Sequence, residues 1–101
     1  TVVETLLFQK QWPCYWTESE RDRFVNYIAE FPNAGDVVPD SGGLRKVRWG
    51  RTGRGKSGGV RVIYFTRHLN DQIVLLTMYA KSSLDNLSAA RLKEIRDALE
   101  D

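Results

Sequence analysis

Two apolar segments joined by four polar residues constrain the fold of this chain more than any other feature. "VRVIYFTR" at 60–67 and "QIVLLTMY" at 72–79 are rich in β-branched and aromatic residues, and "HLND" connects them. Strand-forming segments this close together predict an antiparallel hairpin. The second segment is apolar on both faces, so we expect it to lie in the interior of a sheet.

Further elements are indicated by residue periodicity and by helix-start signals. Residues 2–9 and 44–49 are predicted to be two more strands, and "PNAGDVVPDSGG" at 32–43 a loop. Thr17 and Glu20 form a capping box, which predicts a helix that ends at Pro32. Its expected apolar stripe comprises Phe24, Val25, Ile28 and Phe31. A last helix is expected from Ser88, with Leu87 and Leu92 as a hydrophobic staple and Leu92, Ile95 and Leu99 as its buried stripe.

The order of these elements predicts an α+β fold. We expect a single domain over residues 1–101, with a mainly antiparallel, twisted sheet of about four strands packed with an N-terminal and a C-terminal helix. A chain of 101 residues buries enough surface to fold without a metal or a disulfide. The rings of "WPCYW" are expected to pack against the core; they are Trp12, Tyr15 and Trp16.

Charge is distributed very unevenly along the chain. Residues 41–70 contain eight Lys and Arg and no Asp or Glu, a local charge of +8, whereas the whole chain carries only +2. Such a block increases the self-repulsion of the folded state, so stability alone does not favour it. A polyanion is the natural partner, and nucleic acid is the commonest polyanion.

A glycine-rich segment, "GRTGRGKSGG" at 50–59, matches the pattern of the phosphate-binding loop of nucleotide triphosphatases. In those proteins the loop opens into a helix, whose free amides hold the phosphates. Here a strand follows, so we reject a nucleotide site. Arg51, Arg54 and Lys56 lie between the glycines, and we expect them to contact an RNA backbone instead.

Other classes of site and location are constrained by single residues. The lone Cys14 cannot form an internal disulfide, which suits a reducing, cytoplasmic location. No apolar segment approaches the roughly 20 residues of a membrane helix, so we expect no membrane contact. One His and one Cys exclude a His/Cys zinc site. We expect no metal and no cofactor.

Strand alternation predicts which cations point together. Lys46 and Arg48 share one face of their strand, and Arg61 opens the next strand on the face of Ile63 and Phe65. Lys81 and Tyr79 lie at the end of the following strand, where they can converge on the same place. Such a group can cleave RNA without a metal, by attack of the 2′-hydroxyl on the adjacent phosphorus.

The quoted segments together resemble a known family. "AGDVVPDSGGLRKVRWGRTGRGKSGGVRVIYF", followed by "IVLLTMYAKSSLDNLS", is similar to the HigB-like branch of the RelE toxin superfamily. The resemblance implies a type II toxin–antitoxin toxin that cleaves mRNA on the ribosome and is silenced by a cognate antitoxin, usually of helix-turn-helix type. It assigns the active basic residues to Arg61, Lys81, Lys46 and Arg48. Relatives that use a C-terminal Tyr or His differ from this chain, which ends "RLKEIRDALED".

The predicted function is therefore a ribosome-dependent mRNA endoribonuclease. Arg61 is expected to hold the scissile phosphate, with Arg48 as electrostatic support and either Lys46 or Lys81 transferring protons. RNA-binding residues are predicted to be Arg45, Arg51, Arg54, Lys56, Arg67 and Tyr79. The alternatives are a gyrase inhibitor of the ParE type, since a shared fold does not decide the target, and a non-catalytic RNA-binding module.

Overall fold

The computed structural model of the chain describes residues 1–50, 59–68, 70–80 and 88–100. Its elements in chain order are β1 (Val2–Glu4), α1 (Leu6–Gln11), the 3-10 helix η1 (Trp12–Cys14), α2 (Glu18–Glu30), β2 (Asp36–Val37), β3 (Arg45–Trp49), β4 (Val60–Arg67), β5 (Gln72–Ala80) and α3 (Ala89–Glu100). No helix within these described residues is both long and apolar enough to span a membrane.

The strands form one sheet in the order β1-β5-β4-β3-β2. β1 pairs with β5 in parallel, and the other three pairs are antiparallel. This confirms the predicted mainly antiparallel α+β fold, with five strands in place of about four. The hairpin of β4 and β5 is also confirmed. β5 lies between β1 and β4, which explains why both of its faces are apolar.

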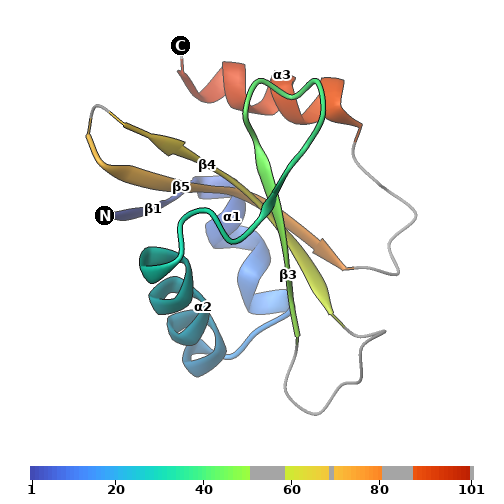
Figure 1. Cartoon of the computed structure of the whole chain (residues 1–101). Helices are drawn as coiled ribbons and strands as arrows, with labels where there is room; N and C mark the ends of the chain where they lie inside the picture. The colour runs from blue at the N-terminus through green and yellow to red at the C-terminus, as the bar shows by residue number, and fades with distance from the viewer. Residues whose placement is uncertain (51–58, 69, 81–87, 101) are drawn as a thin grey trace.

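Each face of the sheet carries its own core. On one face, Val47, Val62 and Tyr64 pack with Phe24 and Ile28 of α2. On the other face, Leu44, Ile63, Phe65, Val74 and Leu76 pack with Leu92, and Ile95 borders them. Figure 1 shows α1 and α2 on one side of the sheet and α3 on the other. Alternate residues of one strand therefore serve different layers.

The predicted strand over residues 2–9 is confirmed for Val2–Glu4 and was wrong beyond them, because a helix begins at Leu6. Thr5 caps α1: its hydroxyl oxygen accepts a hydrogen bond from the Phe8 amide at 3.0 Å. The residues that follow, including Leu, Gln and Lys, have good helix propensity. At the other end of α1, Gln11 Oε1 accepts hydrogen bonds from the Met78 amide and the Thr77 hydroxyl. It thus covers the edge of β5 beyond the end of β1.

The capping box that begins α2 is confirmed, with Thr17 and Glu20 each accepting a hydrogen bond from the other's amide. Phe24 and Ile28 are buried as expected. Phe31 was wrongly placed in the stripe: its side chain is 50% exposed. The reason is that Phe31 is the C-cap, with a non-helical φ of −124°, so it lies outside the helical repeat.

The segment 32–43 is not entirely loop, because Asp36 and Val37 form β2 against β3. Gly35 precedes them, and a Cβ there would lie 2.9 Å from both the Lys46 carbonyl oxygen and Tyr64 Cε1. Beyond β2 the buried Ser41 hydroxyl donates to the Val38 carbonyl at 2.6 Å and accepts from the Leu44 amide. These contacts fix the turn that leads into β3.

The aromatic segment and the last helix largely follow expectation. Trp16 is buried, and Trp12 and Tyr15 pack against the same core. Ser88 caps α3 by accepting a hydrogen bond from the Arg91 amide at 3.1 Å. Leu87 lies outside the described residues, as does the side chain of Leu99, so the staple stays a prediction.

Candidate functional site

A row of three side chains crosses the centre of the sheet. Arg48 on β3 lies directly opposite Arg61 on β4, and Arg61 lies directly opposite Tyr79 on β5. Directly opposed residues of antiparallel strands share a face, with Cβ atoms about 4.5–5.5 Å apart. We call Arg48, Arg61 and Tyr79 the cation row. Lys46, opposite Ile63, lies on the same face two residues away along β3.

An irregularity in the hairpin aligns the row. The pairing of β4 with β5 shifts by one residue between Ile63 and Tyr64, so that β5 contains one extra residue. Without this bulge Arg61 would lie opposite Met78, which is buried in the core on the α2 face. Bulges are common beside functional sites because they redirect a side chain. Here the bulge brings Tyr79 to Arg61.

The alternation of "RKVRW" sets the orientation of β3. Val47 is buried and Trp49 partly buried on the α2 face, which leaves Lys46 and Arg48 exposed on the other face. Arg45 shares the face of Val47, and its Nη1 donates to the Gly35 carbonyl at 2.7 Å. Arg45 therefore lies on the opposite face from the cation row, and its hydrogen bond fixes the segment before β2.

Arg61 is buried, with only 9% of its surface exposed. No carboxylate among the described residues forms an ion pair with it, and its cross-strand neighbour Arg48 carries the same charge. A buried charge without a partner is costly, and like charges directly opposed on a sheet are destabilising. A bound anion would relieve both penalties, so the row is suited to hold a phosphate.

Tyr79 supplies a neutral polar group at the end of the row. It borders the core beneath α3. Burial raises the pKa of its phenol above the usual value, and the neighbouring Arg61 offsets only part of that rise. The hydroxyl is therefore protonated at physiological pH and is able to donate a hydrogen bond to an oxyanion.

Arg67 is not part of this group. It lies six residues beyond Arg61 on β4, roughly 20 Å away at the rise of a strand. Its guanidinium stands over the Phe65 ring and donates to Gln72 Oε1 at 3.4 Å. Four other predicted site residues lie outside the described part of the chain: Arg51, Arg54, Lys56 and Lys81.

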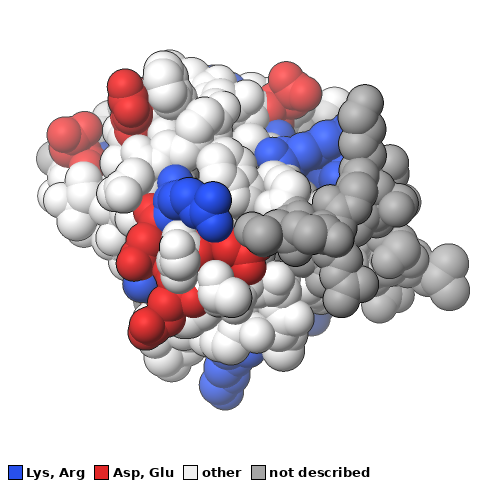
Figure 2. All heavy atoms as spheres, turned by 90° about the horizontal axis from the view of Figure 1, so that it is seen from below, with Lys and Arg blue, Asp and Glu red and all other residues white. Residues whose placement is uncertain are grey.

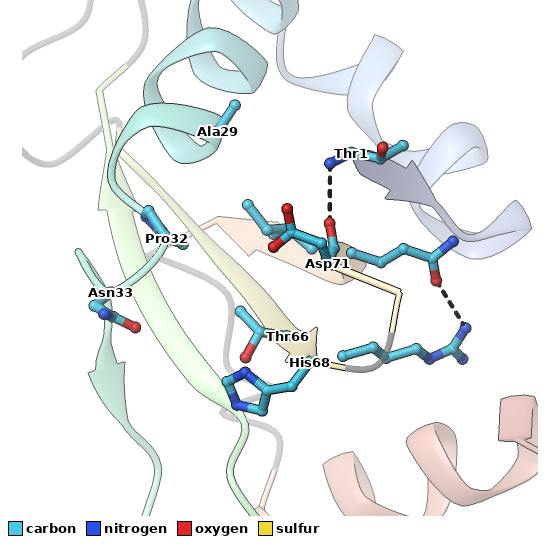
Figure 3. A pocket seen from close by; sticks show the side chains of 10 residues that line it. Thr1, Ala29, Pro32, Asn33, Thr66, His68 and Asp71 are labelled. Atoms are coloured by element: carbon cyan, nitrogen blue, oxygen red, sulfur yellow. Dashed lines mark hydrogen bonds between the residues drawn. The ribbon is translucent and has the colours of Figure 1, made fainter.

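Two hollows differ in their relation to the row. One, of about 220 Å³, is lined by Thr66, His68 and Asp71 at the turn end of the β4–β5 hairpin (Figure 3). It lies about five residues along β4 from Arg61 and shares no residue with the row. The other, of about 480 Å³, lies between the segment 34–39 and β3 and is bordered by Lys46 and Arg48.

Residues on the second hollow were missed by the sequence prediction. Asp36 and Val37 line it, and both had been assigned to a loop. The only signal for them in the sequence is one polar residue, Asp36, followed by the apolar Val37 and Val38. This pattern is too short to indicate a strand. On the face shown in Figure 2, basic side chains near the middle of the view lie beside acidic ones, and further charged side chains of both signs lie toward the rim.

The family of the chain is established by comparison. The model of the RelE toxin of RelE/RelB toxin–antitoxin systems matches residues 7–100. Toxins of this family generally inhibit translation as endoribonucleases, and each has a cognate antitoxin as its partner. The matched residues include all of β2 to β5 and thus the whole cation row. The chain belongs to the RelE toxin family.

Proposed function

We propose that this toxin is a ribosome-dependent mRNA endoribonuclease that cleaves by 2′-hydroxyl attack without a metal ion. The observation that carries the proposal is the buried Arg61, flanked by Arg48 and Tyr79 and lacking a carboxylate partner among the described residues. A mere fold-stabilising arginine would be expected to form an ion pair. One placed for a phosphate needs to be free until the substrate arrives.

Each side chain of the site has a proposed role in the cleavage step. The 2′-oxygen forms a bond to phosphorus while the bond from phosphorus to the 5′-oxygen breaks, leaving a 2′,3′-cyclic phosphate and a 5′-hydroxyl. Lys46 or Lys81 accepts the 2′ proton, and the other delivers a proton to the 5′-oxygen. Arg61 contacts the non-bridging oxygens, where negative charge develops, with Arg48 beside it. Tyr79 donates a hydrogen bond to the same phosphate.

The expected contributions are sufficient for a useful rate. General acid–base help supplies roughly 10²–10⁴-fold, and one fixed donor to a developing oxyanion supplies about 10²–10³-fold. Arg51, Arg54 and Lys56 are proposed to grip the backbone of mRNA or ribosomal RNA. The cognate antitoxin is proposed to be of the helix-turn-helix type, as the HigB-like resemblance implies.

The proposal is tested by cleavage of programmed mRNA on purified ribosomes, with the cut ends mapped. We expect Arg61→Ala to lower the single-turnover rate at least about 100-fold. Arg61→Lys should retain part of the activity, because a lysine keeps the charge but not the planar pair of donors. Circular dichroism and thermal unfolding check that each variant is folded.

Exposed Arg48 provides a second variant that does not disturb the core. Arg48→Ala should lower the cleavage rate about 10-fold or more, because it removes support for the developing charge. Normal cleavage by a folded Arg61→Ala protein would refute the catalytic assignment. An absence of cleavage by the wild type, together with blocked DNA supercoiling, would favour a gyrase inhibitor. Weakened RNA binding without any cleavage would favour a binding module.

A further inference from the structure

A groove of about 480 Å³ adjoins the cation row at the edge of the sheet. Lys46 and Arg48 of β3 border it on one side, and Ala34, Val37 and Pro39 border it on the other. Its volume lies within the roughly 300–1,000 Å³ typical of small-molecule sites. Lys46 and Arg48 lie on the face of the sheet that carries the cation row, which we call the cationic face. Any RNA strand held there by a phosphate therefore passes beside this groove.

We propose that the groove binds the nucleobase next to the phosphate held by the cation row, and that Asp36 makes it selective for guanine. The inference rests on the proposed RNA cleavage and adds to it a base-specific subsite. Single-stranded RNA is recognised in this way, with unstacked bases held against side chains and read along their pairing edges.

The walls of the groove suit the faces of a base. Val37 lies opposite Arg45, on the other face of β2 from Asp36, but it borders the groove at the sheet edge and is 54% exposed; Ala34 and Pro39 add further apolar surface. On the opposite side the Arg48 guanidinium is planar, and such groups stack on bases. A base in the groove would therefore cover apolar surface that is exposed to water in the free protein.

Asp36 is the one carboxylate among the described residues that line the groove. It lies directly opposite Lys46 in the pairing of β2 with β3, so it shares the cationic face. A carboxylate repels phosphate, so at this position it weakens binding of RNA in general. It is an acceptor only, and guanine presents two adjacent donors, N1–H and the N2 amino group, that match its two oxygens. Uracil presents one donor between two carbonyl oxygens.

An antitoxin segment is the other candidate occupant, and the charges of the groove disfavour it. A peptide acidic enough to pair with Lys46 and Arg48 would meet Asp36 at close range. RNA lessens this conflict, because its negative charge lies on the phosphate and the hydrogen-bond donors that would face Asp36 lie on the base. The cations of the groove therefore suit the phosphate of a nucleotide, and its carboxylate suits the base.

The test compares guanine with inosine, which lacks only the N2 amino group. Binding of 2′-O-methyl RNA hexamers, identical except for guanosine, inosine or uridine at one position, is measured by fluorescence anisotropy with the full chain. We expect the guanosine hexamer at its best position to bind about 5- to 100-fold more tightly than the uridine hexamer, with inosine between them. Asp36→Asn should abolish most of this preference and should not weaken binding of the uridine hexamer.

Asp40→Asn is the matched control. It makes the same change of charge at an exposed residue four positions away, whose φ of 60° asparagine tolerates well. It should leave the preference for guanine intact. Unchanged preference in Asp36→Asn would overturn the subsite. So would a loss of antitoxin binding in Asp36→Asn with RNA binding unaltered, because the groove would then be a protein interface.

The outcome for the groove is separable from that for the nuclease. Cleavage on ribosomes with no guanine preference would overturn the subsite and leave the nuclease in place. Guanine preference that depends on Asp36, in a protein that cleaves nothing, would support the subsite and overturn the nuclease. The binding measurement uses RNA that cannot be cut, since its 2′-oxygens are blocked.

Discussion

Two tyrosines on neighbouring strands show how differently a phenol is used in this fold. Tyr64 accepts a hydrogen bond from the Gly35 amide and donates one to the Pro32 carbonyl, both at 2.9 Å. Tyr79 lies beside Arg61 and forms no hydrogen bond to a described residue. Burial raises the pKa of both phenols. Tyr64 thus fastens the end of α2 to the start of β2, whereas we propose that Tyr79 donates to a bound phosphate.

Tyr79→Phe tests this distinction at the level of one atom. It should lower the cleavage rate about 10- to 100-fold, because one donor to the phosphate is lost. A raised pKa keeps the phenol protonated below about pH 10, so the loss should be the same factor at every pH from 6 to 9. Rates of wild type and variant across that range measure it.

Tyr64→Phe is the control for Tyr79→Phe. It leaves a buried amide without its partner, so it should lower stability by about 1–3 kcal/mol, while Tyr79→Phe leaves thermal unfolding nearly unchanged. A factor that varied with pH would show instead that Tyr79 transfers a proton. Equal loss of stability in both variants would show that Tyr79 is structural.

At the level of elements, some structure follows from the sequence and some depends on tertiary context. β3, β4 and β5 were predictable because their alternation and the short connection leave one arrangement. The segment of Leu6 to Gln11 was not, since a short apolar run fits a strand or a helix equally well. The shared face of Lys46 and Arg48 followed from period two, whereas the pairing that sets Arg61 opposite Arg48 is known from the sheet register. The pairing of Arg61 with Tyr79 could not be predicted, because nothing in the sequence indicates the bulge in β5.

The element that covers the cationic face is α3, and Arg96 links it to the turn before β3. Its Nη1 donates to the Gly42 carbonyl, and its guanidinium lies 4.6 Å from the centre of the Phe65 ring. Arg96→Ala should cost about 1–3 kcal/mol, because a charge-assisted hydrogen bond and a cation–π contact are lost. Thermal unfolding should show a midpoint roughly 5–15 °C lower.

Arg91→Ala on the same helix is the control for Arg96→Ala. Arg91 pairs with Glu94 at 3.2 Å, and both side chains are more than half exposed. Such a surface pair contributes about 0–0.5 kcal/mol. A midpoint that fell equally in both variants would show that the loss reflects helix propensity and that the link to Gly42 contributes nothing.

At the scale of the whole molecule, the charged side chains differ in whether they have a partner of opposite charge. Acidic residues such as Glu4 and Asp22 lie with Arg21, which pairs with Glu4 Oε2 at 2.5 Å and with Asp22 at 3.3 Å. Lys46, Arg48 and Arg61 have no such carboxylate partner among the described residues. In the first group one arginine is shared by two carboxylates. The second group is suited to attract a polyanion from outside.

RNA affinity should therefore depend steeply on salt, and Lys46 should account for part of the dependence. For a single strand, each phosphate contact contributes about 0.7 to the slope of log K against log salt concentration. Lys46→Ala should reduce that slope by roughly this amount. Lys10→Ala, at an exposed residue of α1, should not change it. Equal slopes for wild type and Lys46→Ala would exclude Lys46 as a phosphate contact.

The alternation along β3 has a consequence for how this protein can diverge. Val47 and Trp49 are constrained by their packing against α2, while Lys46 and Arg48 point away from that layer. Mutational tolerance along the strand should thus have a period of two, with every second position free of the demands of folding. Because we propose that those positions contact RNA, their substitution should alter the target of the toxin while the packing of β3 against α2 stays unchanged.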